Sequence, residues 1–137
     1  MANECVPYYT PAQTITGKAT ADITGCRFVK IDGTVSPGWQ PEGLQSTATP
    51  NVVPVTPLTT AIKAFGVAQK DVANGKLVGV FRYGVVPVLS GAAVVPGVQV
   101  ESDSTGRAVT LASGVALGMA MSRASAANQI IAVALDL

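Results

Sequence analysis

The chain has 137 residues, of which 48% are hydrophobic, 5% aromatic and 12% charged, and its formal net charge is +1. This length suits one domain with a hydrophobic core of its own, so a second independent domain is not expected. The charged share is about half the usual value. No cluster of like charges occurs along the sequence, so nucleic acid is not the expected partner. No apolar run approaches the ~20 residues of a membrane helix, so no membrane span is expected.

The first thirteen residues have neither helical nor strand periodicity and are expected to form an extended arm. Pro7 and Pro11 flank the adjacent Tyr8 and Tyr9. Two neighbouring tyrosines present rigid apolar surface with polar tips, which suits docking, whereas terminal segments of this kind also fray. The arm, residues 1–13, therefore either docks on a partner or is a frayed terminus. The N-terminal residues 1–7 contain no basic segment followed by an apolar one, so secretion is not expected and folding is expected in the cytoplasm.

Residues 14–137 are expected to form a single β domain, which begins with two short strands. The first is predicted over residues 20–23 and the second over residues 26–31, where apolar and polar residues alternate. Because side chains alternate across a strand, Phe28 is expected on the same side as Cys26, and Val29 on the other. The Asp32-Gly33 pair that follows is a hairpin signal.

Residues 34–60 hold five of the nine prolines and are interpreted as a long Pro-rich loop or insertion. Proline removes a donor from the backbone ladder and pushes its predecessor to extended geometry, so this segment has little capacity for helix or central strand. Trp39 is the only large aromatic residue in this segment. An exposed tryptophan is costly to leave in water, so Trp39 is expected to pack on the domain or on a partner.

The rest of the chain consists of short apolar runs separated by glycine or proline. One helical turn is predicted over residues 70–76, ended by Gly75. Turns are predicted at Ser90-Gly91, at Pro96-Gly97 and over residues 103–106. Strands are predicted over residues 61–68, 77–81, 85–89, 98–101, 107–111, 115–121 and 129–135. Several short strands at regular spacing predict an all-β fold, a small barrel or sandwich.

The residues that carry most enzyme chemistry are missing. The chain has no histidine, which excludes Ser-His-Asp and Cys-His nucleophilic sites, and no phosphate-binding glycine loop occurs. Cys5 and Cys26 have no third ligand, so no metal is expected; a buried free thiol at Cys26 is favoured over a Cys5–Cys26 disulfide. Glu101 and Asp103 form the only close carboxylate pair and are interpreted as solvated turn residues. No catalytic residue and no cofactor are expected.

The order of residues resembles the capsid decoration, or head cement, proteins of tailed bacteriophages. The likeness covers most of the chain. The segments that carry it are Met1-Ala2-Asn3-Glu4-Cys5-Val6-Pro7-Tyr8-Tyr9 with Pro11 and Gly17, Arg27-Phe28-Val29, Phe65-Gly66-Val67-Ala68 with Asp71 and Ala73, Val85-Val86-Pro87-Val88, Pro96-Gly97-Val98-Gln99-Val100, Thr105-Gly106-Arg107, and Ala116-Leu117-Gly118-Met119-Ala120.

This resemblance implies a small β-barrel or β-tulip with an extended arm that decorates the outer surface of the mature icosahedral head. A protein of this kind is made in the host cytoplasm, forms homotrimers on the capsid and clamps neighbouring major capsid protein subunits. The residues expected to contact the capsid are Tyr8, Tyr9 and Pro11 of the arm, or Trp39 of the Pro-rich loop. The alternative is another structural β-module of the virion, a tail or fibre component.

Overall fold

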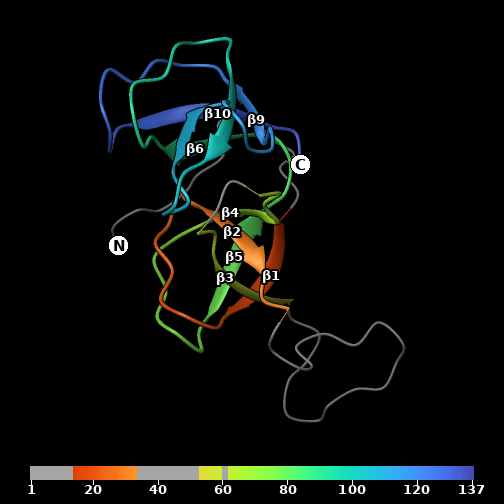
Figure 1. Ribbon diagram of the computed structural model, residues 1–137. Helices are drawn as coiled ribbons and strands as arrows, with labels where there is room; N and C mark the ends of the chain where they lie inside the picture. Colours follow the sequence, from red (N-terminus) through yellow and green to blue (C-terminus); the bar gives the residue numbers. More distant parts are fainter. Residues whose placement is uncertain (1–13, 34–52, 60–61) are drawn as a thin grey trace.

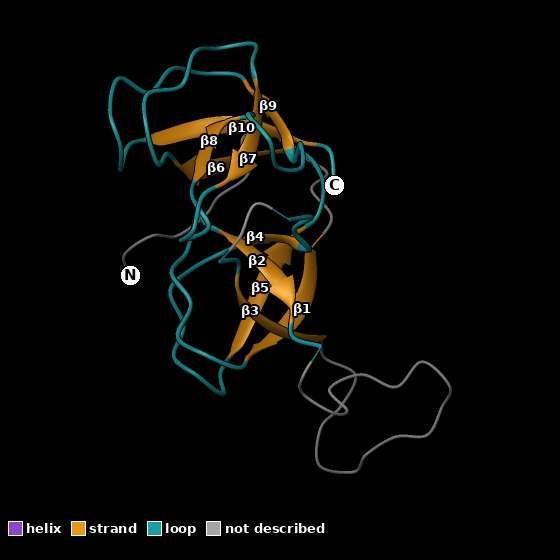
Figure 2. Cartoon of the chain, viewed as in Figure 1, coloured by secondary structure: helices purple, strands orange, loops and turns teal. Residues whose placement is uncertain are grey.

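A computed structural model describes residues 14–33, 53–59 and 62–137, and all regular elements within these ranges are β-strands (Figure 2). The predicted all-β fold is therefore confirmed. Within the same ranges no helix is long and apolar enough to cross a membrane.

The first half of the described chain forms a closed five-stranded barrel in the order β1-β3-β2-β4-β5, with β5 pairing back onto β1 (Figure 1). The pair β1·β3 is parallel and the other pairs are antiparallel. Closure leaves this sheet without an exposed edge. The strands are β1 (Thr14–Ala19), β2 (Phe28–Ile31), β3 (Val53–Pro57), β4 (Gly66–Ala68) and β5 (Leu77–Phe81).

Strand β3 corrects the prediction that residues 34–60 have little strand capacity. It lies between β1 and β2 in the barrel although Pro54 and Pro57 belong to it. A proline lacks the backbone donor but keeps its carbonyl, and the Pro54 oxygen accepts a hydrogen bond from the Asp32 nitrogen at 2.9 Å. The hairpin signal at Asp32-Gly33 is confirmed in part: β2 and β3 are consecutive and pair antiparallel, but residues 32–52 separate them, so Asp32-Gly33 alone does not connect the two strands.

Three further predictions in this half differ from the structure. Residues 70–76 form no helical turn: Val72 bridges to Ile23, and Gly75, with φ +85°, sits in a tight turn closed by a bond from the Lys76 nitrogen to the Ala73 oxygen. The strand expected over 20–23 is reduced to that bridge, and the strand expected over 61–68 is reduced to β4. In each case pairing with a distant segment overrides the local preference.

The second half forms an open five-stranded antiparallel sheet in the order β6-β10-β9-β7-β8. The predicted strands here are confirmed in number and position, and the predicted bounds of β5 and β6 are those of the structure. The strands are β6 (Val85–Leu89), β7 (Gln99–Ser102), β8 (Ala108–Thr110), β9 (Gly118–Ala120) and β10 (Ile130–Leu135).

Strand β2 belongs to both hydrophobic cores. Val29 packs inside the barrel, whereas Phe28 joins Cys26 in a larger cluster shared with the second sheet, as the alternation predicts. Backbone hydrogen bonds also cross between the two parts: Leu89 donates to the Cys26 oxygen and Phe28 to the Gly106 oxygen, both at 2.8 Å. The sheet is thereby held over the end of the barrel near β2 and β4 (Figure 1).

Candidate functional site

The residues that the sequence singles out for capsid contact lie outside the described ranges. Tyr8, Tyr9 and Pro11 belong to residues 1–13, and Trp39 belongs to residues 34–52. Their role remains a prediction. The same holds for the state of the two cysteines, because Cys5 also lies outside the described ranges, while Cys26 is buried.

A surface that the sequence reasoning missed lies on the outer face of the second sheet. The side chains that point inward from β6, β10 and β9 are buried in the shared core, so the alternate residues point outward. Cross-strand pairs bring these outward residues together. The outer face consists of Val85, Pro87, Leu89, Gln99, Met119, Met121, Ile130, Ala132 and Ala134. Of these, Gln99, Met119, Met121 and Ile130 are exposed, Pro87 is buried and the others are half-buried.

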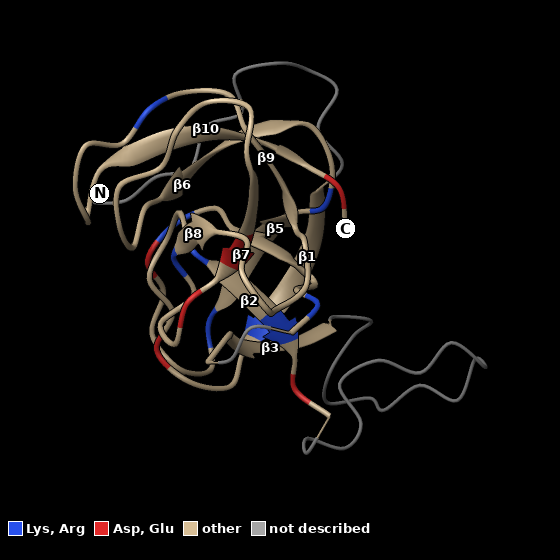
Figure 3. Ribbon diagram, turned by 45° about the horizontal axis from the view of Figure 1, so that its top comes forward, with Lys and Arg blue, Asp and Glu red and all other residues tan. Residues whose placement is uncertain are grey.

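This outer face is apolar over β6, β9 and β10, and the one charged side chain that alternation places on the same side of β7, Glu101, is buried. Met119, Met121 and Ile130 are 47%, 51% and 45% exposed, and the ribbons of β6, β9 and β10 carry neither blue nor red in Figure 3. The signal was present in the sequence: residues 83–100 contain no charge, and residues 108–135 contain only Arg123. Exposed apolar side chains on one face of a sheet make that face a candidate interaction site.

The carboxylates of Glu101 and Asp103 do not form a joint site. Glu101 is 8% exposed and accepts hydrogen bonds from the backbone nitrogens of Ala112 and Gly114 at 3.2 and 2.6 Å. It is thus buried rather than solvated, which corrects the prediction for this residue. It orders the loop that follows β8 and is not positioned to act with Asp103.

Asp103 organises the turn between β7 and β8. Its Oδ1 accepts bonds from the backbone nitrogens of Thr105 and Arg107, both at 2.9 Å, and its Oδ2 pairs with Arg107 Nε at 2.9 Å. Partial burial raises the pKa of this carboxyl, but the hydrogen bonds from Arg107 and Thr105 and the charge of Arg107 outweigh it, so the pKa is lowered.

Asp103 is therefore expected to stabilise the fold in a pH-dependent way. Because the folded-state pKa is depressed, its contribution is fully present above the usual value of 3.8 and is lost as pH falls through the lower folded-state pKa. Denaturant unfolding of the wild type and of Asp103→Asn should differ near neutral pH, and the difference should shrink below about pH 4. A difference that stays constant down to pH 2 would contradict this role.

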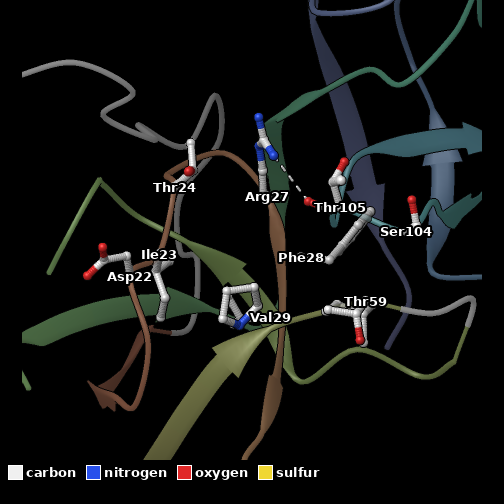
Figure 4. Close-up of a pocket in the computed structure, with 11 residues that line it drawn as sticks. Asp22, Ile23, Thr24, Arg27, Phe28, Val29, Thr59, Ser104 and Thr105 are labelled. Atoms are coloured by element: carbon white, nitrogen blue, oxygen red, sulfur yellow. Dashed lines mark hydrogen bonds between the residues drawn. The ribbon is translucent and has the colours of Figure 1, made fainter. Parts of the chain in front are cut away.

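A cavity of about 280 Å³ lies where the barrel meets the β7–β8 turn (Figure 4). Arg27, immediately before β2, and Thr105 of the turn line it from two sides. The Arg27 Nη1 donates to the Thr105 oxygen at 3.3 Å, and the Arg27 Nε is buried with no hydrogen-bond partner. Within the described ranges, no group of three or more Cys, Asp or Glu side chains is placed to hold a metal ion.

Comparison with known proteins gives one family and one fold. The sequence model of a family described as phage cement protein matches residues 9–135. The crystal structure of the N base of the head fiber gp8.5 of bacteriophage phi29 has a similar fold, with a TM-score of 0.67 and 18% identity, covering 92% of this chain and 95% of that one. No curated protein sequence gives a significant match.

Proposed function

The chain belongs to the phage cement protein family, and from this premise we propose that it binds the outer surface of the mature phage head and clamps neighbouring major capsid protein subunits together. Membership makes it a structural, head-associated component of the virion. The clamp, the position on the outer surface and the capsid partner are the parts that this proposal adds. It assigns no catalytic step to the chain.

The observation that carries this proposal is the outer face of the second sheet, whose exposed side chains are uncharged. Removing water from the exposed Met119, Met121 and Ile130 costs little free energy, because none of these side chains is charged. Burying it against another protein gains roughly 25 cal/mol for each Å² of apolar surface. The face is therefore suited to a lasting protein contact rather than to a soluble ligand.

We further propose that residues 1–13, with Tyr8, Tyr9 and Pro11, extend over the capsid or add a strand to a neighbouring sheet. Strand addition supplies backbone hydrogen bonds and suits an extended segment. In a homotrimer, three such arms and three bodies would engage neighbouring subunits at once. The second and third engagements are then effectively intramolecular, so modest single contacts give a tight hold.

The test is to add the purified protein to heads that lack it and to measure both binding and the temperature at which the heads release their DNA. The wild type should bind and raise the release temperature. A variant without residues 2–13 should stay folded and lose binding, because the arm contact is removed. Met119→Lys should weaken binding, because a cation would have to be desolvated in the contact.

The outcomes separate the parts of the proposal. If the variant without residues 2–13 binds like the wild type and Trp39→Ala does not, the contact belongs to the Pro-rich segment rather than to the arm. If the wild type binds without raising the release temperature, the protein decorates the head but does not clamp it. If the wild type does not bind at all, the proposed function is wrong.

The structural likeness to the head fiber base supports a second candidate function, that of a fibre or tail component. A cement protein that covers the head is expected in a copy number comparable with that of the major capsid protein, whereas a tail component is expected in few copies. The copy number of the chain in purified virions, measured against the major capsid protein, distinguishes a cement protein from a tail component.

A further inference from the structure

Charge is unevenly divided between the two parts of the described chain. The barrel with its connections, residues 14–33, 53–59 and 62–82, carries seven lysines and arginines against three aspartates, a net side-chain charge of +4. Residues 83–137 carry two arginines against three carboxylates, a net side-chain charge of −1. In Figure 3 the ribbon beside the β2 and β3 labels is blue. The positive charge of the described chain is therefore concentrated on the barrel.

The aspartates of the barrel form no ion pairs with its cations. Within the described ranges the one ion pair joins Arg107 to Asp103, in the second part of the chain. Each barrel aspartate accepts a hydrogen bond from a backbone nitrogen or a hydroxyl of the barrel. The donors are the Asn74 nitrogen for Asp22, the Gly25 nitrogen for Asp71 and the Thr20 hydroxyl for Asp32, at 2.9, 2.8 and 2.6 Å. The seven cations are left without an ion-pair partner among the described residues.

Three of these cations lie on neighbouring strands and form what we call the basic barrel surface: Lys18, Lys30 and Lys76. Strand β3 lies between β1 and β2, and Lys18 pairs with Pro54 on one side of it while Lys30 pairs with Thr56 on the other. Neighbouring strands lie about 4.8 Å apart, so Lys18 and Lys30 are separated by roughly 10 Å across the sheet.

The three lysines of the basic barrel surface point away from the core. Ala19 and Val29, which follow Lys18 and precede Lys30 in the chain, are buried inside the barrel, so the alternate side chains of both strands point outward. The Lys76 oxygen accepts a hydrogen bond from the Ala19 nitrogen at 2.9 Å, which places Lys76 beside the end of β1. Lys76 is exposed, and Lys18 and Lys30 are half-buried, so all three are accessible to a partner.

The chemistry of this surface favours an acidic protein over a nucleic acid. Unpaired cations attract an oppositely charged surface over about a Debye length, roughly 8 Å at physiological ionic strength. A nucleic-acid site usually has a longer basic stripe in a strongly basic domain, whereas this chain has a net charge of +1. Asp32 also adjoins the surface, because its nitrogen donates to the Pro54 oxygen at 2.9 Å. Sparse carboxylates on a protein fit this arrangement better than closely spaced phosphates.

We propose that the basic barrel surface binds an acidic patch on the outside of the major capsid protein. The inference rests on the proposed function and adds the chemistry of one capsid contact. A clamp needs two contact surfaces, and in Figure 1 β1 and β3 lie on the side of the barrel away from β9 and β10. The charged contact would speed association and orient the protein, which the apolar outer face cannot do, since apolar contact is not directional.

The first test uses a soluble probe and does not depend on capsid binding. Poly-L-glutamate, titrated at low salt into the isotope-labelled wild type, should shift the backbone NMR signals around Lys18, Lys30 and Lys76 in a saturable way. The shifts should vanish near 1 M salt, where the Debye length is about 3 Å. Absence of shifts, shifts confined to residues 83–137, or tighter binding of a short DNA duplex than of poly-L-glutamate would each overturn the proposal.

The second test measures the rate of association with heads that lack the protein. The double variant Lys18→Gln/Lys30→Gln should associate about fivefold more slowly than the wild type at low salt, with little change in the dissociation rate, and the difference should shrink as salt is added. The matched control, Lys63→Gln/Arg123→Gln, removes the same charge from exposed positions outside the basic barrel surface. This control should associate like the wild type.

The two proposals fail in different ways. If the wild type binds heads and Lys18→Gln/Lys30→Gln associates equally fast, the acidic contact is wrong while the proposed function stands. If both double variants are slowed equally, net charge rather than the basic barrel surface sets the rate, and the placement of the contact is wrong. If the wild type does not bind heads, the proposed function is wrong, and the poly-L-glutamate titration decides separately whether the surface binds acidic chains.

Discussion

Phe28→Ala is expected to lower the free energy of unfolding by about 3–5 kcal/mol, the usual cost of truncating a fully buried phenylalanine. The Phe28 side chain is completely buried in the cluster that the barrel shares with the second sheet. Its removal leaves a cavity between the two parts, which are also joined there by the bond from the Phe28 nitrogen to the Gly106 oxygen. A domain of ordinary stability, about 5–15 kcal/mol, would lose a large share of it.

Guanidinium unfolding followed by circular dichroism measures this loss, and Ile31→Ala is the matched control. Ile31 lies in the same strand but is 50% exposed, so its truncation should cost well under 1 kcal/mol. Because the core is shared, we expect the barrel and the second sheet of the wild type to unfold in one transition. A loss below 1 kcal/mol for Phe28→Ala would show that the shared cluster contributes little.

Gly106→Ala is expected to cost about 3 kcal/mol, for two separate reasons. Gly106 has φ +81°, where a residue with a Cβ pays roughly 1–2 kcal/mol. An added Cβ would also lie 2.8 Å from the Phe28 oxygen, so β2 and the β7–β8 turn would have to move apart. That movement disturbs the hydrogen bond and the core contact at the same junction.

Gly75→Ala separates these two contributions. Gly75 has φ +85°, and a Cβ there would meet no atom within 4 Å, so only the backbone strain remains. We expect it to cost about 1–2 kcal/mol, less than Gly106→Ala, in the same unfolding assay. Equal losses at the two positions would mean that the close approach to Phe28 adds nothing and that the junction adapts freely.

Strand prediction succeeded where glycine delimits an apolar run. Leu77–Phe81 lies between Gly75 and Gly84, and Val85–Leu89 begins directly after Gly84, so the sequence alone marks both strands. Prediction failed where one residue is compatible with two local structures. Gly75 ends helices and also forms tight turns, and only the bridge between Ile23 and Val72 decides for the turn.

Some features of the candidate surfaces could likewise be predicted from the sequence, and others could not. The lack of charge on the outer face could be read from residues 83–100 and 108–135, although the alternation that gathers Met119 and Ile130 on one face required the strand pairing. The cavity could not be predicted, because Arg27 and Thr105 are 78 residues apart and meet only when the second sheet packs on the barrel.

By itself the sequence determined the all-β class, most strand positions, the sharing of one face by Cys26 and Phe28, and the low charge that makes the protein suited to assembly. These properties are local: they follow from alternation, turn residues and composition within a few positions of the chain. Only the tertiary structure decided that β3 joins the barrel between β1 and β2, that β1 and β3 run parallel, and that Arg27 faces a cavity. The physical reason is that alternation says which residues share a face of a strand, whereas the choice of partner strand depends on contacts between distant segments.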